Sequence, residues 1–389
     1  MTVSSGRQFL QIPGPTNVPD RILQAMAMPT IDHRGPAFAE LARFCLARIR
    51  EVVQTEGPVV LYPGSGTGAW EAALVNTLSP GDKVLMWETG HFAWLWRELA
   101  ERLGLQPEVL GGNWGGGPDP EAIEERLRAD TAGEIKAVCI VHNETSTGVT
   151  SRVAAVRKAI DAAGHDALFM VDTISSLASI DYRQDEWGID VTVGGSQKGL
   201  MLPPGLSLNG ISQKALDAHA RAGLQKSYWD WSAMLTPNAD GFFPYTPPTN
   251  LLYGLREALA MLLDEEGLPA VFARHDRHAE ATRRAVRAWG LEILCADERE
   301  YSSSLTAVRM PDGHDADAFR KVVLEGFDMP LGNGLGQLAG RVFRIGHLGW
   351  FNDLMLAGTL SGVEMGLIRA GVPHQPGGVQ AALAYLAEP

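Results

Sequence analysis

The stretch VGGSQKG at residues 193–199 decides how this sequence is interpreted, because it places a lysine shortly after an apolar run. Lys198 has small or polar neighbours, and the sequence LMLPPG follows at 200–205. A lysine is normally a solvated surface residue. One that is withdrawn from water has a lowered pKa and can form an imine with a carbonyl compound, so Lys198 is a candidate catalytic residue.

Two more chemical groups follow apolar runs earlier in the chain. The sequence FMVDTISS at 169–176 contains Asp172, which taken alone is typical of a turn or cap. The sequence GSGTG at 64–68 leads into a predicted helix. Its glycines let backbone N–H groups approach a phosphate, and the hydroxyls of Ser65 and Thr67 are further donors. A tight strand-to-helix turn is the alternative for this segment. No GK[ST] follows and GxGxxG is incomplete, which disfavours nucleotide and dinucleotide sites.

Together, the three groups predict a pyridoxal-phosphate site. The GSGTG segment supplies a phosphate cradle, Asp172 a carboxylate that can keep the pyridinium nitrogen protonated, and Lys198 the amine that forms the imine. The combination is far more specific than any of its members.

The pattern of apolar residues predicts an α/β fold. Short apolar runs alternate with amphipathic segments through the first two thirds of the chain, which is typical of a mainly parallel sheet covered by helices. Ligands of such sheets lie at the carboxyl ends of the strands. We predict strands at 59–62, 84–87, 137–141, 168–172, 191–193 and 206–211, and helices at 69–78, 120–128 and 153–163.

The last third of the chain predicts a smaller α+β domain. Residues 250–290 are helical in pattern and bridge the two parts, strands are expected at 305–310 and 342–345, and helices at 315–325 and 353–368. A length of 389 residues also favours two domains. We divide the chain into an N-terminal arm at 1–20, a large cofactor-binding domain at 21–270 and a small C-terminal domain at 271–389.

Composition excludes several classes of protein. The chain is 45% hydrophobic and 20% charged, as in ordinary globular proteins. Its net charge of −13 and its lack of a basic block predict no nucleic-acid or membrane partner. No targeting segment or membrane span is expected. The three cysteines, Cys45, Cys139 and Cys295, are scattered, which predicts no disulfide framework and no metal site and favours the cytoplasm.

An ordered series of motifs resembles the class V aminotransferases, in particular the serine–glyoxylate and alanine–glyoxylate aminotransferase family. The resemblance runs through nearly the whole chain and implies the fold-type I (aspartate aminotransferase-like) architecture, a seven-stranded type of sheet, and a homodimer with shared active sites. The motifs are PGPTN at 13–17, GSGTG at 64–68, HNETSTG at 142–148, VDT at 171–173, GSQK at 195–198, PPG at 203–205 and RIGHLG at 344–349.

The resemblance also implies roles for individual residues. The cofactor's phosphate would be bound by Ser65, Gly66 and Thr67, with Gln197 nearby, and its ring by the residues Phe92, Thr145 and Asp172. Ordinary core packing is the alternative for Phe92. Thr246 would reach the phosphate from the second subunit. Phe243 stands where some relatives carry a tyrosine, so that contact is lost or is supplied by Tyr245.

Two arginines are candidates for the substrate carboxylate. Arg344 lies between apolar residues, and a guanidinium binds a carboxylate through two hydrogen bonds. Arg34, in the sequence HRGP at 33–36, resembles the serine–glyoxylate branch, although it can also be a surface residue paired with an acid.

The resemblance implies an aminotransferase that moves an amino group from a small amino acid, with serine preferred, to glyoxylate. Aspartate, alanine or ureidoglycine are the alternative donors. A pyridoxal-phosphate lyase such as a cysteine desulfurase is a rival that needs a reactive cysteine on a mobile loop. A phosphate-binding or regulatory protein would leave Asp172 and Lys198 unexplained. The sequence predicts no role for the loop at 111–117 or for Trp187, Trp229 and Trp231.

Overall fold

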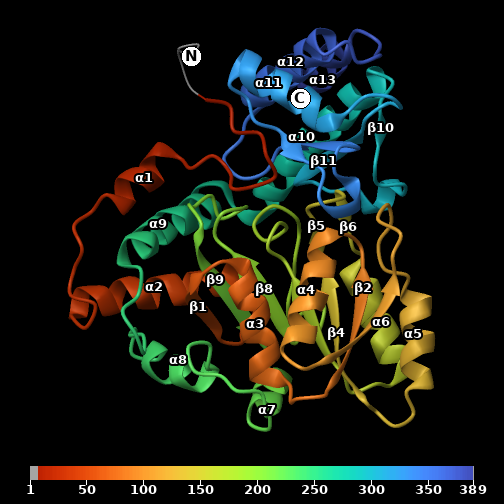
Figure 1. Ribbon diagram of the computed structural model, residues 1–389. Helices are drawn as coiled ribbons and strands as arrows, with labels where there is room; N and C mark the ends of the chain where they lie inside the picture. Colours follow the sequence, from red (N-terminus) through yellow and green to blue (C-terminus); the bar gives the residue numbers. More distant parts are fainter. Residues whose placement is uncertain (1–7, 389) are drawn as a thin grey trace.

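A computed structural model describes residues 8–388, and its larger part is built on a seven-stranded sheet in the order β1-β9-β8-β7-β4-β2-β3 (Figure 1). The strands from β8 to β3 are parallel, and β9 runs antiparallel to both β1 and β8. The fold class is therefore confirmed. The strands are β1 (Val59–Gly64), β2 (Lys83–Glu88), β3 (Gln106–Gly111), β4 (Ile135–Val141), β7 (Leu168–Asp172), β8 (Val191–Gly195) and β9 (Gly205–Ile211).

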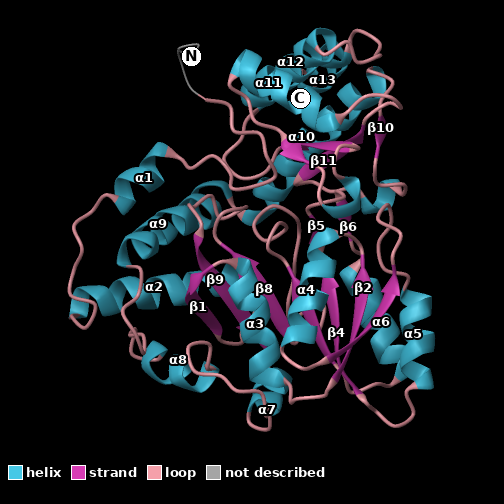
Figure 2. Cartoon of the chain, viewed as in Figure 1, coloured by secondary structure: helices cyan, strands magenta, loops and turns pink. Residues whose placement is uncertain are grey.

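Helices cover both faces of this sheet (Figure 2), which is why its central strands are apolar along their whole length. All five residues of β7 are buried, for example. One face packs against α2 (Pro36–Val53), α5 (Pro120–Ala129), α6 (Val153–Ala163) and α9 (Thr249–Ala260). The other packs against α3 (Gly66–Thr77), α4 (His91–Arg102), α7 (Gln213–His219) and α8 (Trp231–Asn238).

The C-terminal part has its own sheet and its own core. The strands β10 (Glu292–Ile293), β11 (Leu305–Arg309), β13 (Val342–Gly346) and β12 (Gly332–Asn333) pair antiparallel in that order. They pack with α10 (Leu268–Ala288), α11 (Ala316–Phe327), α12 (Asp353–Arg369) and α13 (Gly378–Leu386) around a separate apolar cluster. The predicted α+β character of this region is confirmed.

Two short elements and one break complete the chain path. The helix α1 (Asp20–Met26) packs on α9, and the hairpin of β5 (Asn143–Glu144) and β6 (Val149–Thr150) follows β4. The predicted helical stretch at 250–290 is divided, because a π-helical turn (Met261–Glu266) ends at Gly267, whose φ is +80°. The domain boundaries remain a prediction. Residues 1–7 of the predicted arm lie outside the described residues, and Gln11 bridges to Leu331 next to the small sheet.

The sequence analysis did not predict β3. Its sequence QPEVLG has no apolar run, because β3 is an edge strand and none of its residues is fully buried. Within residues 8–388, no helix combines the length and apolar character needed to span a bilayer.

Candidate active site

The cavity that holds the predicted residues lies at the carboxyl ends of the parallel strands. It has a volume of about 190 Å³. Asp172 ends β7, Ser65 follows β1, and Lys198 follows β8, so the sheet brings together residues that are far apart in sequence. Eight of the predicted residues line the cavity: Ser65, Gly66, Thr67, Phe92, Thr145, Asp172, Gln197 and Lys198.

Lys198 is buried, and the N-terminal segment closes over it. Its amine donates a hydrogen bond to the carbonyl of Pro13, and the hydroxyl of Thr16 donates to the backbone carbonyl of Lys198 (3.1 Å). Burial lowers the pKa of Lys198 to about 7, with a smaller contribution from the charge of Arg344. A substantial share of the amine is therefore neutral near pH 7, the form that attacks a carbonyl carbon.

Gly14 explains why the PGPTN segment is needed. A Cβ atom at this position would lie 2.4 Å from both Cδ and Nζ of Lys198, and its φ of +104° favours glycine. The close approach of the N-terminal backbone to the lysine thus depends on the missing side chain.

Asp172 is a buried carboxylate with two donors. Its Oδ2 accepts a hydrogen bond from the indole N–H of Trp70 (3.0 Å), and its Oδ1 accepts one from the backbone N–H of Ile174 (2.7 Å). Burial raises the pKa of Asp172 to about 7, against the effect of these hydrogen bonds. A positive charge placed beside it would favour the ionised form.

The N-terminus of α3 forms a donor-rich wall of the cavity. Gly66 and Thr67 begin the helix, so their N–H groups have no carbonyl one turn earlier to bind. A Cβ at Gly66 would lie 2.1 Å from Cδ1 of Ile174, so any other residue would require Ile174 to move. Ser65 and Thr67 are exposed, and Gln197 lines the same cavity. An anion at this position would gain both donors and the field of the helix.

Thr145 and Phe92 are held by neighbours that the sequence analysis did not identify. The hydroxyl of Thr145 donates to Oγ of Ser175 (2.8 Å), which also accepts from the amide of Asn143 (2.8 Å). The carboxylate of Glu144 accepts the backbone N–H groups of Phe92 (3.3 Å) and Ala93 (3.1 Å) at the start of α4. These hydrogen bonds join residues that are far apart in the sequence, so no local sequence motif could have revealed them.

Arg344 lies in β13 and does not line the cavity, but it binds Thr145, which does. Its Nη1 donates to the carbonyl of Thr145 (2.7 Å), and its Nε donates to the carbonyl of Asn333 (2.7 Å). Only 6% of Arg344 is exposed, and burial lowers its pKa to about 10. The guanidinium therefore stays charged at neutral pH, and the small sheet places this positive charge next to the cavity.

Four predicted residues do not line the cavity within one chain: Arg344, which contacts its wall, and Arg34, Tyr245 and Thr246. Arg34 is exposed in the loop before α2, and Thr246 is exposed in the loop before α9. The ring of Tyr245 stacks on Tyr228, with the ring centres 4.4 Å apart, and its hydroxyl makes no hydrogen bond to any described residue.

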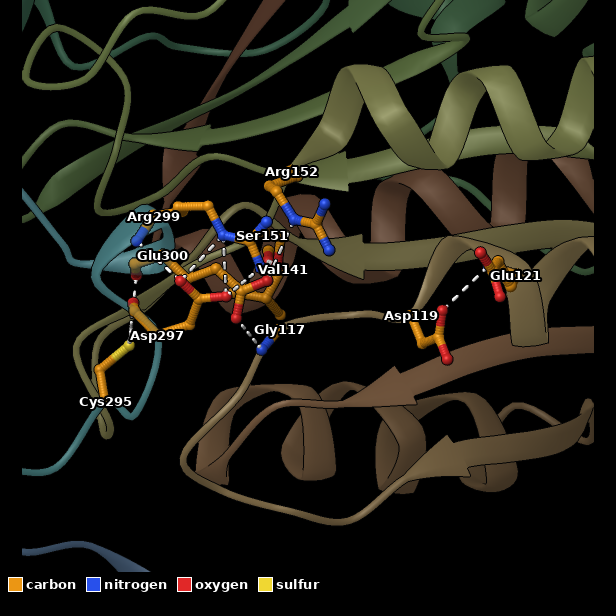
Figure 3. Close-up of polar contacts among 10 residues, drawn as sticks. All are labelled: Gly117, Asp119, Glu121, Val141, Ser151, Arg152, Cys295, Asp297, Arg299 and Glu300. Atoms are coloured by element: carbon orange, nitrogen blue, oxygen red, sulfur yellow. Dashed lines mark hydrogen bonds and ion pairs between the residues drawn. The ribbon is translucent and has the colours of Figure 1, made fainter.

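The loop at 111–117 connects the two parts of the molecule (Figure 3). The backbone N–H of Gly117 donates to Oε2 of Glu300 (2.7 Å), and Arg152 binds Oε1 of the same carboxylate (3.2 Å). Trp114, in the middle of the loop, donates to Glu88 (3.0 Å) and packs with Leu338 and with Leu305, Ala307 and Val342 of the small sheet. The loop therefore joins the edge strand β3 to the C-terminal part.

The three tryptophans to which the sequence assigned no role pack against other residues of the large sheet region. Trp229 packs against Gly64 and Gly68 in the turn between β1 and α3, and Trp231 is buried at the start of α8. Trp187 meets Tyr182 edge to face, with ring centres 5.8 Å apart.

The three cysteines are buried free thiols. Burial raises the pKa of Cys45 and Cys295 to about 12 and that of Cys139 further. Thiols of this kind are poor nucleophiles, so the structure offers no candidate for the reactive cysteine that a desulfurase needs. The described residues also contain no group of three or more His, Cys, Asp or Glu side chains arranged for a metal ion.

The fold and this cavity define a pyridoxal-phosphate enzyme of fold type I. The family described as aminotransferase class-V matches residues 9–338, and the chain belongs to that family. It is an aminotransferase that uses pyridoxal phosphate, and the residues present fit this cofactor. The donors at the α3 N-terminus suit a phosphate, while Asp172 and Lys198 suit the ring nitrogen and the aldehyde.

Two related proteins and one crystal structure are similar to this chain over nearly its full length. The chain is 52% identical to a serine–glyoxylate aminotransferase from Methylorubrum extorquens, over 98% of this chain and 97% of that protein. It is 47% identical to an L-aspartate–glyoxylate aminotransferase from Paracoccus denitrificans, over 95% and 94%. The crystal structure of the ureidoglycine–glyoxylate aminotransferase from Bacillus subtilis superposes with a TM-score of 0.89 at 30% identity, over 99% and 100%.

Proposed function

We propose that this enzyme transfers the amino group of a small amino acid, with serine preferred, to glyoxylate, which yields glycine and a 2-oxo acid. The observation that carries the proposal is the 52% identity over nearly the full chain to a serine–glyoxylate aminotransferase. Eight predicted residues lining one cavity support it. Aspartate is the second candidate donor, because the L-aspartate–glyoxylate enzyme is 47% identical over a similar span. Alanine and ureidoglycine remain further alternatives.

The proposed cofactor contacts follow from the cavity. Ser65, Gly66 and Thr67 bind the phosphate, with Gln197 as an additional polar contact. Thr145 contacts the phenolic oxygen, Phe92 covers the face of the ring, and Asp172 binds the ring nitrogen. The close match between these groups and the predicted set supports the assignment.

Catalysis is divided between a few residues. Pyridoxal phosphate, when bound, supplies an aldehyde that carries the amino group and a ring that accepts electrons. The amine of Lys198 would hold the cofactor and, when free, would take the proton from the substrate's alpha carbon and return it on the cofactor side. Asp172 keeps the ring nitrogen charged. Arg344 binds the substrate carboxylate and orients the C–H bond to be broken, with Arg34 as the next candidate.

We also propose that the enzyme is a homodimer with shared active sites. Thr246 is exposed and lies away from its own chain's cavity, which fits a phosphate contact made to the other subunit. Tyr245 lies beside it, with a hydroxyl that is unpartnered within the described residues. The buried unpaired cysteines support a reducing compartment such as the cytoplasm.

Assays of serine, alanine and aspartate with glyoxylate test the proposed donor. We expect serine to give the highest kcat/KM. If aspartate leads by tenfold or more, a difference of about 1.4 kcal/mol in transition-state binding, aspartate replaces serine as the donor. Absence of glycine formation with all three would contradict glyoxylate as the acceptor.

A further inference from the structure

We propose that Trp70 is a positioning residue, whose indole N–H holds the Asp172 carboxylate in the orientation that binds the cofactor's ring nitrogen. The inference rests on the proposed role of Asp172. It adds a residue to which the sequence analysis assigned no role, although Trp70 follows directly after the GSGTG segment and Ala69.

The geometry gives Trp70 a defined task. Its Nε1 lies 3.0 Å from Oδ2 of Asp172, and only 2% of its surface is exposed. Because Asp172 is buried, each donor to its carboxylate replaces water that the site excludes. Trp70 and the N–H of Ile174 are the two donors that the described residues supply to this carboxylate. Removing the indole N–H leaves one of its oxygens without a protein donor.

The same helix also supplies the phosphate-binding wall. Residues four apart in a helix lie on one face, so Gly66 and Trp70 of α3 both point to the cavity. The phosphate cradle and the support of Asp172 are therefore fixed relative to one another by one rigid element. Because both are fixed, a single cofactor molecule can place its phosphate at the cradle and its ring nitrogen at Asp172 at the same time.

The charged groups around Asp172 act in opposite directions. Lys198, after β8, favours the ionised carboxylate, and Glu144, in β5, disfavours it. His142 follows β4, and its backbone N–H donates to the carbonyl of Asp172 (2.8 Å); burial lowers the pKa of its imidazole to about 4, so it is neutral near pH 7. The hydrogen bond from Trp70 adds to the effect of Lys198 without adding a charge.

Trp96 provides a matched control. It is fully buried, its ring stacks on Trp70 at 5.9 Å with an interplanar angle of 12°, and its own Nε1 has no hydrogen-bond partner among the described residues. Trp70→Phe and Trp96→Phe remove the same atoms from the same stack. Only Trp70→Phe removes a hydrogen bond to Asp172.

The test measures binding of pyridoxamine phosphate, which has no aldehyde to react with Lys198, and of its 1-deaza analogue, in which C–H replaces the ring nitrogen. The measured quantity is the ratio of the two dissociation constants, by calorimetry on cofactor-free protein. Since hydrogen bonds to charged groups are among the stronger ones, we expect Trp70→Phe to reduce the preference for the nitrogen-containing ligand about tenfold. Trp96→Phe should keep the wild-type ratio.

Asp172→Asn distinguishes a failure of the proposed role of Trp70 from a failure of the proposed role of Asp172. If this variant loses the preference while Trp70→Phe and Trp96→Phe both keep it, Asp172 binds the ring nitrogen and the role of Trp70 is overturned. If Asp172→Asn keeps the preference, the proposed role of Asp172 fails, and the role of Trp70 fails with it.

A measurement on the unaltered protein covers the case in which Trp70→Phe does not fold. In cofactor-free protein with ¹⁵N-labelled tryptophan, one indole N–H resonance should shift as Asp172 titrates and become independent of pH in Asp172→Asn. A spectrum in which no indole resonance follows that titration overturns the inference.

Discussion

Gly14 shows how one missing side chain controls the reactive lysine. In Gly14→Ala the new methyl group would overlap the end of Lys198, so we expect the amine to move and cofactor attachment to fall at least tenfold, an energetic cost of about 1.4 kcal/mol or more. The fraction of cofactor fixed to the protein by borohydride measures attachment.

Gly112→Ala is the control for backbone strain. Gly112 has nearly the same φ, +102° against +104°, but a Cβ there would have nothing within 4 Å. Equal loss of attachment in both variants would mean that strain, and not contact with Lys198, is the cause.

Asp172 makes the stability of the cofactor-free protein depend on pH. Its pKa is raised by burial from about 3.9 in an unfolded chain to about 7 in the folded protein, so the folded state binds the proton more tightly. The resulting stabilisation is complete below pH 4 and is lost as pH rises through 7.

Asp172→Asn removes this pH-dependent contribution. We expect the variant to gain stability relative to wild type at pH 8, by a few kcal/mol on the order of the shift, and to gain less at pH 5. Thermal unfolding of both cofactor-free proteins at the two pH values gives the comparison. Lys198 also titrates near pH 7, and the charge of Asp172 raises its pKa, so the comparison is repeated with both proteins carrying Lys198→Ala. A difference in stability that is the same at pH 5 and pH 8 would argue against the raised pKa.

At the scale of elements, a short 3₁₀ turn (Glu298–Glu300) links the C-terminal part to the rest. Glu300 is only 5% exposed and accepts from the N–H of Gly117 and from Arg152. Glu300→Ala should cost about 1–3 kcal/mol in the free energy of unfolding, because it leaves the partly buried N–H of Gly117 without its acceptor and Arg152 without its ion-pair partner. Denaturant unfolding measures the loss.

Glu298→Ala is the matched control in the same turn. Glu298 pairs with Arg287 at the surface, with 74% of its side chain exposed. Such pairs contribute little, so its removal should leave the unfolding midpoint nearly unchanged. If both variants lose the same stability, the contact with the 111–117 loop is not what stabilises this junction.

Most of the central sheet could be predicted from the sequence, because its strands are buried on both faces and therefore apolar throughout. The prediction for β7 matches the structure at both ends. The edge strand β3 was not predicted, because a half-exposed strand has no continuous apolar run. Within the site, glycines, a carboxylate and a lysine after strands gave a pattern, whereas Trp70 and Glu144 act through partners distant in sequence. Their roles follow only from the three-dimensional packing.

At the scale of the whole molecule, the charge of −13 opposes the binding of anionic substrates. A buried cation must overcome this field, and Arg344 is the proposed one. Its Nε and Nη1 already bind backbone carbonyls, which fix the guanidinium plane. A carboxylate would add charge-assisted hydrogen bonds in a site that excludes water, where they are strongest.

Arg344→Lys keeps the charge but loses the planar set of donors, so KM for donor and acceptor should rise and kcat should fall. Arg344→Ala should lower kcat/KM at least tenfold, since a hydrogen bond to a charged group contributes about 1.5–3 kcal/mol. Steady-state kinetics with both substrates provide the measurement. The cofactor's absorbance should stay unchanged.

Arg341→Lys is the control, because Arg341 is exposed one residue before β13 and its substitution should leave KM and kcat as they are. Unaltered kinetics in both Arg344 variants would move the carboxylate site elsewhere, and the same pair of substitutions at Arg34 would then be the next to make.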